Sequence, residues 1–288
     1  MSKIVVVLGP TGVGKTRLSV SLAKYLDAVI VNADSMQVYK ELNIGTAKIK
    51  ESEKEGIEHF LFDICDVEED YNIYKYQIDG RRLIDKFIKE NKNVIIVGGS
   101  GLYIKSLLYD YKFQDENINE TYDDLTNEEI LEEIVKHHKT EIHVNNRKRL
   151  VRELNKIKNE NNLQSDISKK VYDFITLGLT CDREKLYEIV NKRVDEMVQE
   201  GLVSEVRSLY DRGIRSKAIM TGIGYKELYQ YFDGEKTLDE AIELIKKNTR
   251  NFIKRQYTFF NHQMDVNWLE VDFYDFENTI KEAIKLIA

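Results

Sequence analysis

The stretch Ile4-Val5-Val6-Val7-Leu8, followed directly by Gly9-Pro10-Thr11-Gly12-Val13-Gly14-Lys15-Thr16, decides the fold class. The first five residues form a short, mostly β-branched run, which is typical of a strand buried on both faces of a parallel sheet. The next eight match G-x-x-x-x-G-K-[ST], in which glycines let backbone N–H groups surround an anion. A helix-compatible stretch from Lys15 to about Leu26 follows, and its N-terminus adds a positive dipole end. The sequence therefore predicts a P-loop with a diphosphate-sized anion site.

Lys15 and Thr16 end this motif and bear on the same anion. Lys15 adds a point charge, and the hydroxyl of Thr16 is placed to bind Mg²⁺. A chance match in a chain of this length is on the order of one per cent, and the motif lies between a strand and a helix, as it must. The pattern leaves open whether the ligand is a nucleotide.

Further apolar runs predict more strands of the same sheet. Ala28–Asn32 and Val94–Val97 resemble the first run, and a helical pattern from Tyr74 to Lys89 lies between them. Weaker candidates are Phe174–Leu179 and Val266–Val271. Strands that alternate with helices indicate βαβ units and a parallel sheet. We therefore expect an α/β fold with a P-loop NTPase-like core.

Composition narrows the class of protein. The chain has 288 residues, of which 42% are hydrophobic and 32% charged, so it is typical of a globular protein and not of a disordered one. Its net charge of −7, taken whole, argues against a general nucleic-acid or membrane binder, but it does not exclude a local basic surface. Cys65 and Cys181 lie far apart without metal-type spacing, which argues against a disulfide scaffold or structural zinc. No apolar run approaches the roughly 20 residues that span a bilayer, so we expect a cytoplasmic protein.

The middle of the chain differs in charge and in pattern. Residues 114–135 carry many acidic side chains and no Lys or Arg, whereas Arg147–Lys158 is strongly basic. No strand pattern appears here, and the polar segment 158–166 is typical of a loop. We therefore expect a helical insertion at 111–166, between a first core segment at 1–110 and a largely helical completion of the core at 167–288.

Polar residues follow the second and third predicted strands. Asp34 comes after the second strand and Ser100 after the third, and the carboxyl ends of parallel strands line the ligand crevice of an open α/β sheet. Three roles fit Asp34: a Mg²⁺ ligand, a general base, or a helix N-cap. Ser100 fits either a functional hydroxyl or the cap of a strand-to-helix turn.

The P-loop is followed in order by further motifs. They read D-S-x-Q-x-Y, I-G-T-A-K, H-x-L-x-D and G-G-[TS]-G-L-Y, and four further segments come after them. The elements are Asp34–Tyr39, Ile44–Lys48, His59–Asp63, Gly98–Tyr103, His143–Leu154, Asn191–Met197, Gly222–Glu227 and Thr249–Gln256. From residue 3 to about residue 270, the chain resembles the tRNA dimethylallyltransferase family, also called tRNA isopentenyltransferases.

The chain departs from this family pattern at a few positions. Ser100 stands where Thr is usual, Val144 and Asn146 replace Pro and Asp, Ile49 replaces a common Pro, and Phe259 replaces a common Trp. Ser100 keeps the hydroxyl, and none of the changes touches Asp34, Lys15 or Arg193.

The resemblance implies transfer of a dimethylallyl group from dimethylallyl diphosphate to N6 of adenosine 37 in tRNA, with Mg²⁺. In that reaction Asp34 would be the general base, Ser100 would hydrogen-bond near the reacting atoms, and Arg193 would add a donor fork to the diphosphate. The residues expected to bind the diphosphate are Gly9, Thr11, Gly12, Val13, Gly14, Lys15 and Thr16, of which Thr16 would also bind the metal.

The tRNA anticodon stem-loop is the partner that the resemblance implies, and the acceptor base must leave its stack to reach the crevice. The residues expected to receive that base are Asp34, Ser35, Met36, Gln37 and Ser100. Gln37 would read an adenine edge through paired donor and acceptor groups. The expected backbone contacts are Lys48, Arg147, Lys148, Arg149, Arg152, Arg250, Lys254 and Arg255. For the run from Arg147 to Lys158, a solvated face is the alternative to a phosphate clamp.

Two other classes stay open. A P-loop small-molecule kinase would use Asp34 to hold Mg²⁺ or a substrate hydroxyl, and an RNA-binding NTPase would lack transferase chemistry. We expect a monomer that does not bind membranes.

Overall fold

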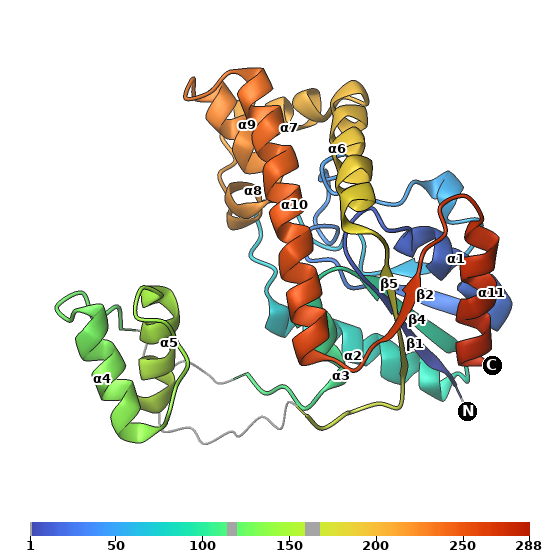
Figure 1. The fold of residues 1–288 in the computed structure, drawn as a ribbon, viewed down its shortest axis with the longest axis horizontal. Helices are drawn as coiled ribbons and strands as arrows, with labels where there is room; N and C mark the ends of the chain where they lie inside the picture. The colour runs from blue at the N-terminus through green and yellow to red at the C-terminus, as the bar shows by residue number, and fades with distance from the viewer. Residues whose placement is uncertain (1, 114–119, 159–167) are drawn as a thin grey trace. The chain divides into compact units, whose positions relative to one another are not determined.

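The computed structural model describes residues 2–113, 120–158 and 168–288. A parallel six-stranded sheet with the order β3-β2-β4-β1-β5-β6 forms its centre (Figure 1). The strands are β1 (Ile4–Leu8), β2 (Ala28–Asn32), β3 (His59–Phe60), β4 (Asn93–Gly98), β5 (Ile175–Thr180) and β6 (Asn267–Glu270). The predicted α/β fold with a parallel core is confirmed. β3 escaped prediction because its two residues are too short to show a periodic pattern.

Most of the described helices surround this sheet or extend from it. They are α1 (Lys15–Leu26), α2 (Ile73–Lys89), α3 (Gly101–Leu108), α6 (Arg183–Gln199), α7 (Leu202–Asp211), α8 (Lys217–Thr221), α9 (Tyr225–Phe232), α10 (Leu238–Gln263) and α11 (Phe276–Ile287), together with a short 3-10 turn, Glu51–Glu53. The predicted helix from Lys15 to Leu26 is observed, and the mostly helical character of the later chain is confirmed. None of the helices described is both long and apolar enough to cross a membrane.

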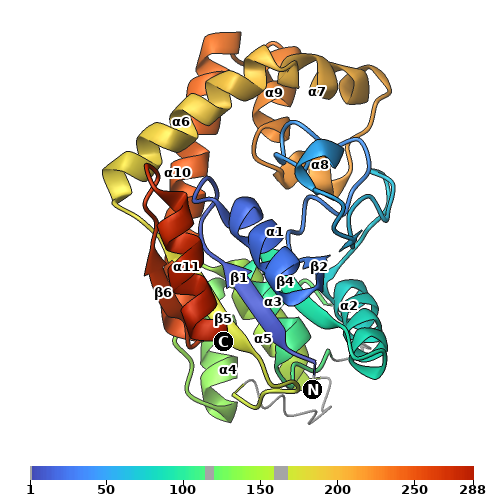
Figure 2. The same cartoon turned by 90° about the vertical axis from the view of Figure 1, so that its right-hand side faces the viewer.

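The sheet is buried on both faces, because successive side chains of a strand point to opposite sides. Val5 and Val7 of β1 belong to one core cluster with α1 and α11, whereas Val6 and Leu8 belong to a second cluster with α2 and α3. Figure 2 shows α1 and α11 in front of the strands. Covering both faces explains why the strands are continuous apolar runs and not alternating ones.

A third hydrophobic cluster joins α7, α8, α9 and the start of α10 to the segment that follows β2. Val38 and Leu42 of that segment are completely buried against these helices. α10 contacts α9, α6 and α3, so one long helix links the helical part to the sheet (Figure 1). This packing brings distant parts of the chain to the end of the sheet.

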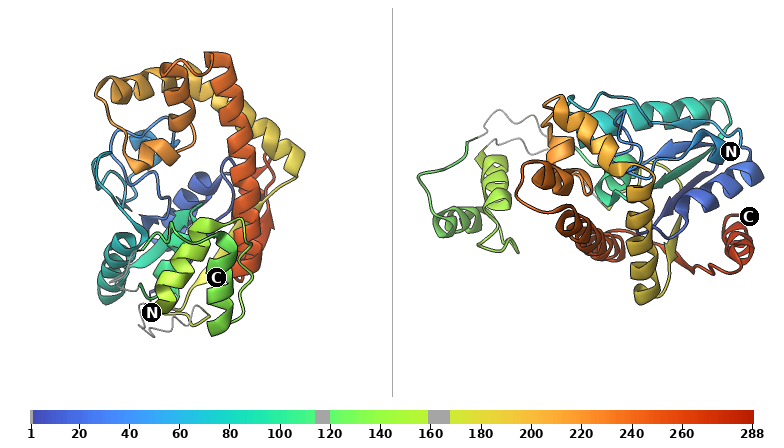
Figure 3. Two further views of the ribbon diagram at one scale, coloured as in Figure 1. Left: turned by 90° about the vertical axis from the view of Figure 1, so that its left-hand side faces the viewer. Right: turned by 90° about the horizontal axis from the view of Figure 1, so that it is seen from above.

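The chain divides into two compact units, residues 1–109 with 170–288, and residues 110–169. The second unit contains α4 (Asn127–His137) and α5 (Arg147–Lys158), which pack side by side (Figure 3). Their shared core has its own buried residues: Tyr122, Ile130, Ile134, Leu150 and Leu154. The acidic residues Asp115 and Glu116, and positions 159–166 of the predicted polar loop, lie outside the described residues.

The carboxyl ends of three strands meet at one edge of the sheet. Leu8 of β1 pairs with Gly98 of β4, and Asn32 of β2 pairs with Val97 of β4, so β1, β2 and β4 end at nearly the same level. The P-loop, the Asp34 segment and the Ser100 segment therefore all begin at this edge.

Candidate active site

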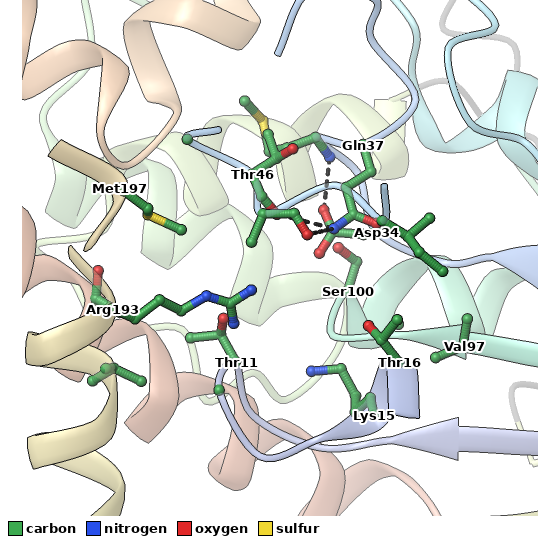
Figure 4. Close-up of a pocket in the computed structure, with 18 of the residues that line it drawn as sticks. Thr11, Lys15, Thr16, Asp34, Gln37, Thr46, Val97, Ser100, Arg193 and Met197 are labelled. Atoms are coloured by element: carbon green, nitrogen blue, oxygen red, sulfur yellow. Dashed lines mark hydrogen bonds between the residues drawn. The ribbon is translucent and has the colours of Figure 1, made fainter. Parts of the chain in front are cut away.

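A cavity of about 1140 Å³ opens at this edge of the sheet (Figure 4). Its walls come from the P-loop, the segments after β2 and β4, the Gly45–Ala47 loop, α6, the Thr221–Tyr225 segment and α10. Elements that are far apart in the chain thus surround one space that is large enough for a diphosphate and a nucleobase together.

The P-loop backbone requires its glycines. Gly9 and Gly12 have φ angles of 143° and 84°, in the region that side-chain-bearing residues rarely adopt. A Cβ on Gly9 would lie 2.6 Å from the carbonyl oxygen of Leu179, and one on Gly12 would lie 2.8 Å from Cγ1 of Val190. Val13 is completely buried among apolar residues, so its backbone alone is available to a ligand.

Lys15 lies inside the cavity, and no carboxylate of the described residues is at hydrogen-bond distance from it. Its Nζ donates to the carbonyl oxygen of Pro10 at 2.7 Å. Burial lowers the pKa of Lys15 to about 8; the charge of Asp34 opposes this shift, and the charge of Arg193 adds to it. A lysine with a pKa below its usual 10.5 is poised to gain stabilisation from an anion, because the anion would replace the missing solvation.

Arg193 of α6 is a second cation that faces this space. Figure 4 shows its guanidinium pointing into the cavity toward the side where Lys15 and Thr11 lie. Burial lowers the pKa of Arg193, an effect that Glu53 opposes. In the part of the chain that the structure describes, no group accepts a hydrogen bond from this guanidinium. A half-buried guanidinium whose N–H groups are free in the described part of the chain, next to a lysine, suits an anion that accepts two parallel hydrogen bonds, such as a diphosphate.

The structure removes one of the three roles that fit Asp34. Its Oδ1 accepts a hydrogen bond from the backbone N–H of Met36 at 2.9 Å, which closes a turn; no helix begins here. The backbone N–H of Asp34 donates to Oδ1 of the buried Asn32 at 2.9 Å. Asp34 is therefore no helix cap. Among the described residues its Oδ2 has no partner, so one carboxylate oxygen is available to a ligand.

Ser100 ties the ends of two strands together. Its Oγ accepts a hydrogen bond from the backbone N–H of Ser35 at 3.0 Å and donates to the Ser35 hydroxyl at 3.2 Å. Ser100 occupies the N-cap position of α3, but its hydroxyl makes no capping hydrogen bond there. A Cβ on Gly98 would lie 2.1 Å from the carbonyl oxygen of Ala33, which shows how closely the two strand ends approach.

Gln37 has one end of its amide committed. Its Nε2 donates to the carbonyl oxygens of Thr46 at 2.9 Å and Ala47 at 3.4 Å. These two carbonyls can only accept hydrogen bonds, so they determine which end of the amide faces them. The amide therefore leaves only its oxygen to bind a base. Gln37 was expected to contact the base with both a donor and an acceptor, and only the acceptor is available. Met36 packs beside Gly222: its Cε atom would lie 2.7 Å from a Cβ added to Gly222.

Gln256 of α10 belongs to the site, although the sequence reasoning gave it no role. Its Oε1 accepts from the backbone N–H of Thr11 at 3.1 Å, and its Nε2 donates to the carbonyl oxygen of Gly99 at 3.0 Å. It thus joins the P-loop to the turn before Ser100. The sequence does contain one indication of this role: Gln256 lies on the same helical face as Ile253, and a polar residue is unusual in such an apolar stripe.

Comparison with known proteins agrees with this geometry. The family model described as IPP transferase matches residues 37–263. A tRNA dimethylallyltransferase of Anoxybacillus flavithermus is 44% identical, over 99% of this chain and 96% of its own length, and one of Geobacillus thermodenitrificans is 43% identical, over 99% and 96%. The chain belongs to the IPP transferase family.

Solved structures of this family share the fold. The tRNA isopentenylpyrophosphate transferase of Staphylococcus epidermidis superposes with a TM-score of 0.77 at 34% identity, covering 100% of this chain and 99% of the other. A eukaryotic dimethylallyltransferase acting on tRNA gives a TM-score of 0.80 at 26% identity, covering 99% and 78%. The family resemblance read from the motifs is confirmed.

The basic residues of α10 differ in their surroundings. Arg250 donates to Oδ1 of Asn191 at 2.6 Å, Lys254 is exposed, and Arg255 lines the cavity. Lys246, one turn before Arg250, is paired with acidic side chains of α6 and α10. Lys254 and Arg255 therefore have more freedom to meet a phosphate than Lys246 and Arg250 have.

Lys48 is held within the protein. Its Nζ is hydrogen-bonded to the carboxylate of Asp63 at 2.5 Å and to the carbonyl oxygen of Tyr39 at 2.7 Å, and its side chain is only 6% exposed. These contacts give it a visible role in holding the Ile44–Lys48 loop. A contact with tRNA stays a prediction for this residue.

Within the second unit, the predicted clamp residues also divide into two kinds. The guanidinium of Arg147 donates to the carbonyl oxygens of Leu125 and Tyr122 and to the side chain of Asn127. These bonds join the start of α5 to the segment before α4. The exposed cations of the helix are Lys148, Arg149, Arg152, Lys156 and Lys158, of which Lys156 is paired with Glu153.

The surroundings of Thr16 fit a metal that is bound mainly by its substrate. Thr16 lines the cavity, and no described residue is hydrogen-bonded to its hydroxyl. The described residues contain no group of three or more His, Cys, Asp or Glu that could hold a metal by itself. Mg²⁺ is commonly bound by one or two side chains together with phosphate oxygens and water, which suits this arrangement.

Proposed function

We propose that the chain transfers the dimethylallyl group of dimethylallyl diphosphate to N6 of adenosine 37 in tRNA. The carrying observation is that one cavity brings together Lys15, Arg193 and the Asp34 carboxylate, one oxygen of which is free among the described residues. A diphosphate leaving group needs the cations, and a nucleophilic amino group needs the base. The family's named transferase activity supports the same reaction.

In this reaction the bond between C1 of the donor and its bridging oxygen breaks, and a bond forms between C1 and N6. The diphosphate leaves with the electron pair and is stabilised by the P-loop N–H groups, Lys15 and Arg193. The N6 proton passes to Oδ2 of Asp34. Ser100 positions the Ser35 backbone beside the acceptor base. Mg²⁺ bound by Thr16 and the diphosphate would supply further positive charge to the leaving group.

The tRNA side of the proposal rests on exposed cations that flank the cavity or lie on α5. We propose that Arg255 and Lys254 meet phosphates near the flipped base, while Lys148, Arg149 and Arg152 contact the anticodon stem. We propose that the enzyme acts as a monomer, and its tRNA substrate supports a cytoplasmic location.

The test is to incubate the protein with dimethylallyl diphosphate, Mg²⁺ and unmodified tRNA, and then to weigh the nucleosides. We expect the mass of one dimethylallyl group on adenosine, and only in a tRNA with adenosine at position 37. No mass gain would reject the transferase. ATP hydrolysis without such a gain would support one of the two alternatives, the kinase or the RNA-binding NTPase.

A further inference from the structure

Glu205 of α7 makes a concentrated set of hydrogen bonds behind the cavity wall. Its Oε2 accepts from the backbone N–H groups of Asn43 at 3.1 Å and Ile44 at 2.7 Å. Its Oε1 accepts from the backbone N–H of Gly45 at 3.1 Å and the hydroxyl of Tyr225 at 2.7 Å. Three successive N–H groups converge on one carboxylate, as in the backbone nests that bind anions.

The loop held in this way is tightly built. A Cβ on Gly45 would lie 2.7 Å from the ring of Tyr225, so loop and ring are in direct contact. The Thr46 hydroxyl donates to the carbonyl oxygen of Leu42 at 2.6 Å, and Ala47 has a φ of 48°, which is unfavourable for alanine. A backbone in this conformation persists only where its surroundings hold it, and Glu205 binds three N–H groups of the residues just before Thr46 and Ala47.

The same loop orients Gln37. The carbonyl oxygens of Thr46 and Ala47 accept from Nε2 of Gln37, and they follow directly after the three N–H groups that Glu205 binds. Both Gln37 and the Gly45–Ala47 loop line the cavity, whereas Glu205 does not. The hydrogen bonds of Glu205 therefore connect it to the cavity through the loop and through Tyr225.

We propose that Glu205 is a positioning residue, which holds the Asn43–Ala47 loop and thereby keeps the amide oxygen of Gln37 directed at the acceptor base. This inference rests on the proposed function. An oxygen at that position accepts a hydrogen bond from the amino group of adenine and repels the 6-oxo group of guanine or hypoxanthine. Glu205 would thus favour an amino-bearing purine without touching it.

Glu205→Gln is the matching substitution. The amide keeps one acceptor oxygen and replaces the other by an NH₂ group, which cannot accept from the N–H groups that it meets. The same helix supplies a matched control, Asp211→Asn. Among the described residues, the Asp211 carboxylate is paired with Arg207 alone, at 3.8 Å, and makes no hydrogen bond to the loop.

The experiment is a double-mutant cycle with Gln37→Ala, in which kcat/KM is measured for an unmodified tRNA transcript with adenosine at position 37. We expect Glu205→Gln to lower kcat/KM roughly tenfold in the parent and less than about twofold in the Gln37→Ala background, since residues of one network are not additive. The dissociation constant for inorganic diphosphate should stay the same, and Asp211→Asn should change neither value.

An equal loss in both backgrounds, or no loss in either, would overturn the inference. If Glu205→Gln does not fold, Tyr225→Phe takes its place in the cycle, because it removes one of the four bonds and keeps the ring against Gly45. The parent protein is assayed before any variant. If it forms no prenylated adenosine, the proposed function itself is overturned.

Discussion

The ammonium group of Lys15 should make anion binding weaken as the pH rises. Burial, opposed by Asp34 and reinforced by Arg193, lowers its pKa to about 8. At this pKa the free protein carries the charge in about 90% of molecules near pH 7 and in about 10% near pH 9. Because the diphosphate site needs that charge, its affinity should fall by roughly tenfold over this range.

The sign follows from which state binds the proton. The bound anion stabilises the ammonium and raises the pKa of Lys15, so above about pH 8 binding must take up a proton from solution. Below about pH 7 the ammonium is already formed and no uptake is expected. A lysine with its usual pKa of 10.5 would show neither effect in this range.

Isothermal titration calorimetry with inorganic diphosphate measures both quantities. Buffers with different ionisation enthalpies give the number of protons taken up, and the dissociation constant is compared with that of Lys15→Arg, whose guanidinium stays charged. The ligand's own ionisation is common to both proteins and cancels in the ratio. A ratio independent of pH, together with no proton uptake by the parent at pH 8.5, would refute the reasoning.

Three further predictions concern other parts of the chain. Asp34→Asn should keep tRNA binding and lower the transfer rate by about 10²–10⁴; a nearly unchanged single-turnover rate would remove Asp34 as the base. Gly98→Ala should lower the free energy of unfolding by more than about 2 kcal/mol in urea titrations, because its Cβ would meet the Ala33 carbonyl oxygen at 2.1 Å, and a parental value would contradict that close approach. Arg147→Ala should lower the thermal midpoint of unfolding without changing the salt dependence of tRNA affinity. Lys148→Ala should leave the midpoint unchanged and reduce the slope of that salt dependence by about one. The reverse pattern would exchange the roles of the two residues.

The parts of the site that were predictable are those encoded by neighbouring residues. A buried strand, a glycine-rich turn and a helix start follow from local backbone preferences, so the P-loop could be located from one stretch of sequence. Asp34 and Ser100 could be placed at the same edge because parallel strands end together. The family motifs added Arg193. Because Arg193 is far from Lys15 in the sequence, no local pattern shows that the two side chains face the same cavity.

Side-chain partners were less predictable, because charge and residue type do not reveal which group a side chain meets. Lys48 stands in a motif, yet only the structure shows its ammonium against Asp63. Gln37 was expected to offer both a donor and an acceptor, but Thr46 and Ala47 take the donor. Gln256 reaches Thr11 across 245 positions of sequence, and no local pattern announces such a bond.

The sequence by itself therefore determined the α/β core, the anion-binding turn and the family, since each depends on short-range geometry or on contiguous motifs. Only the tertiary structure decided how the site is held: which oxygen of Asp34 is free, which end of the Gln37 amide faces the cavity, and that Glu205 supports the loop behind it. The physical reason is that hydrogen bonds are made between particular atoms at about 3 Å, and packing alone brings atoms from distant segments that close.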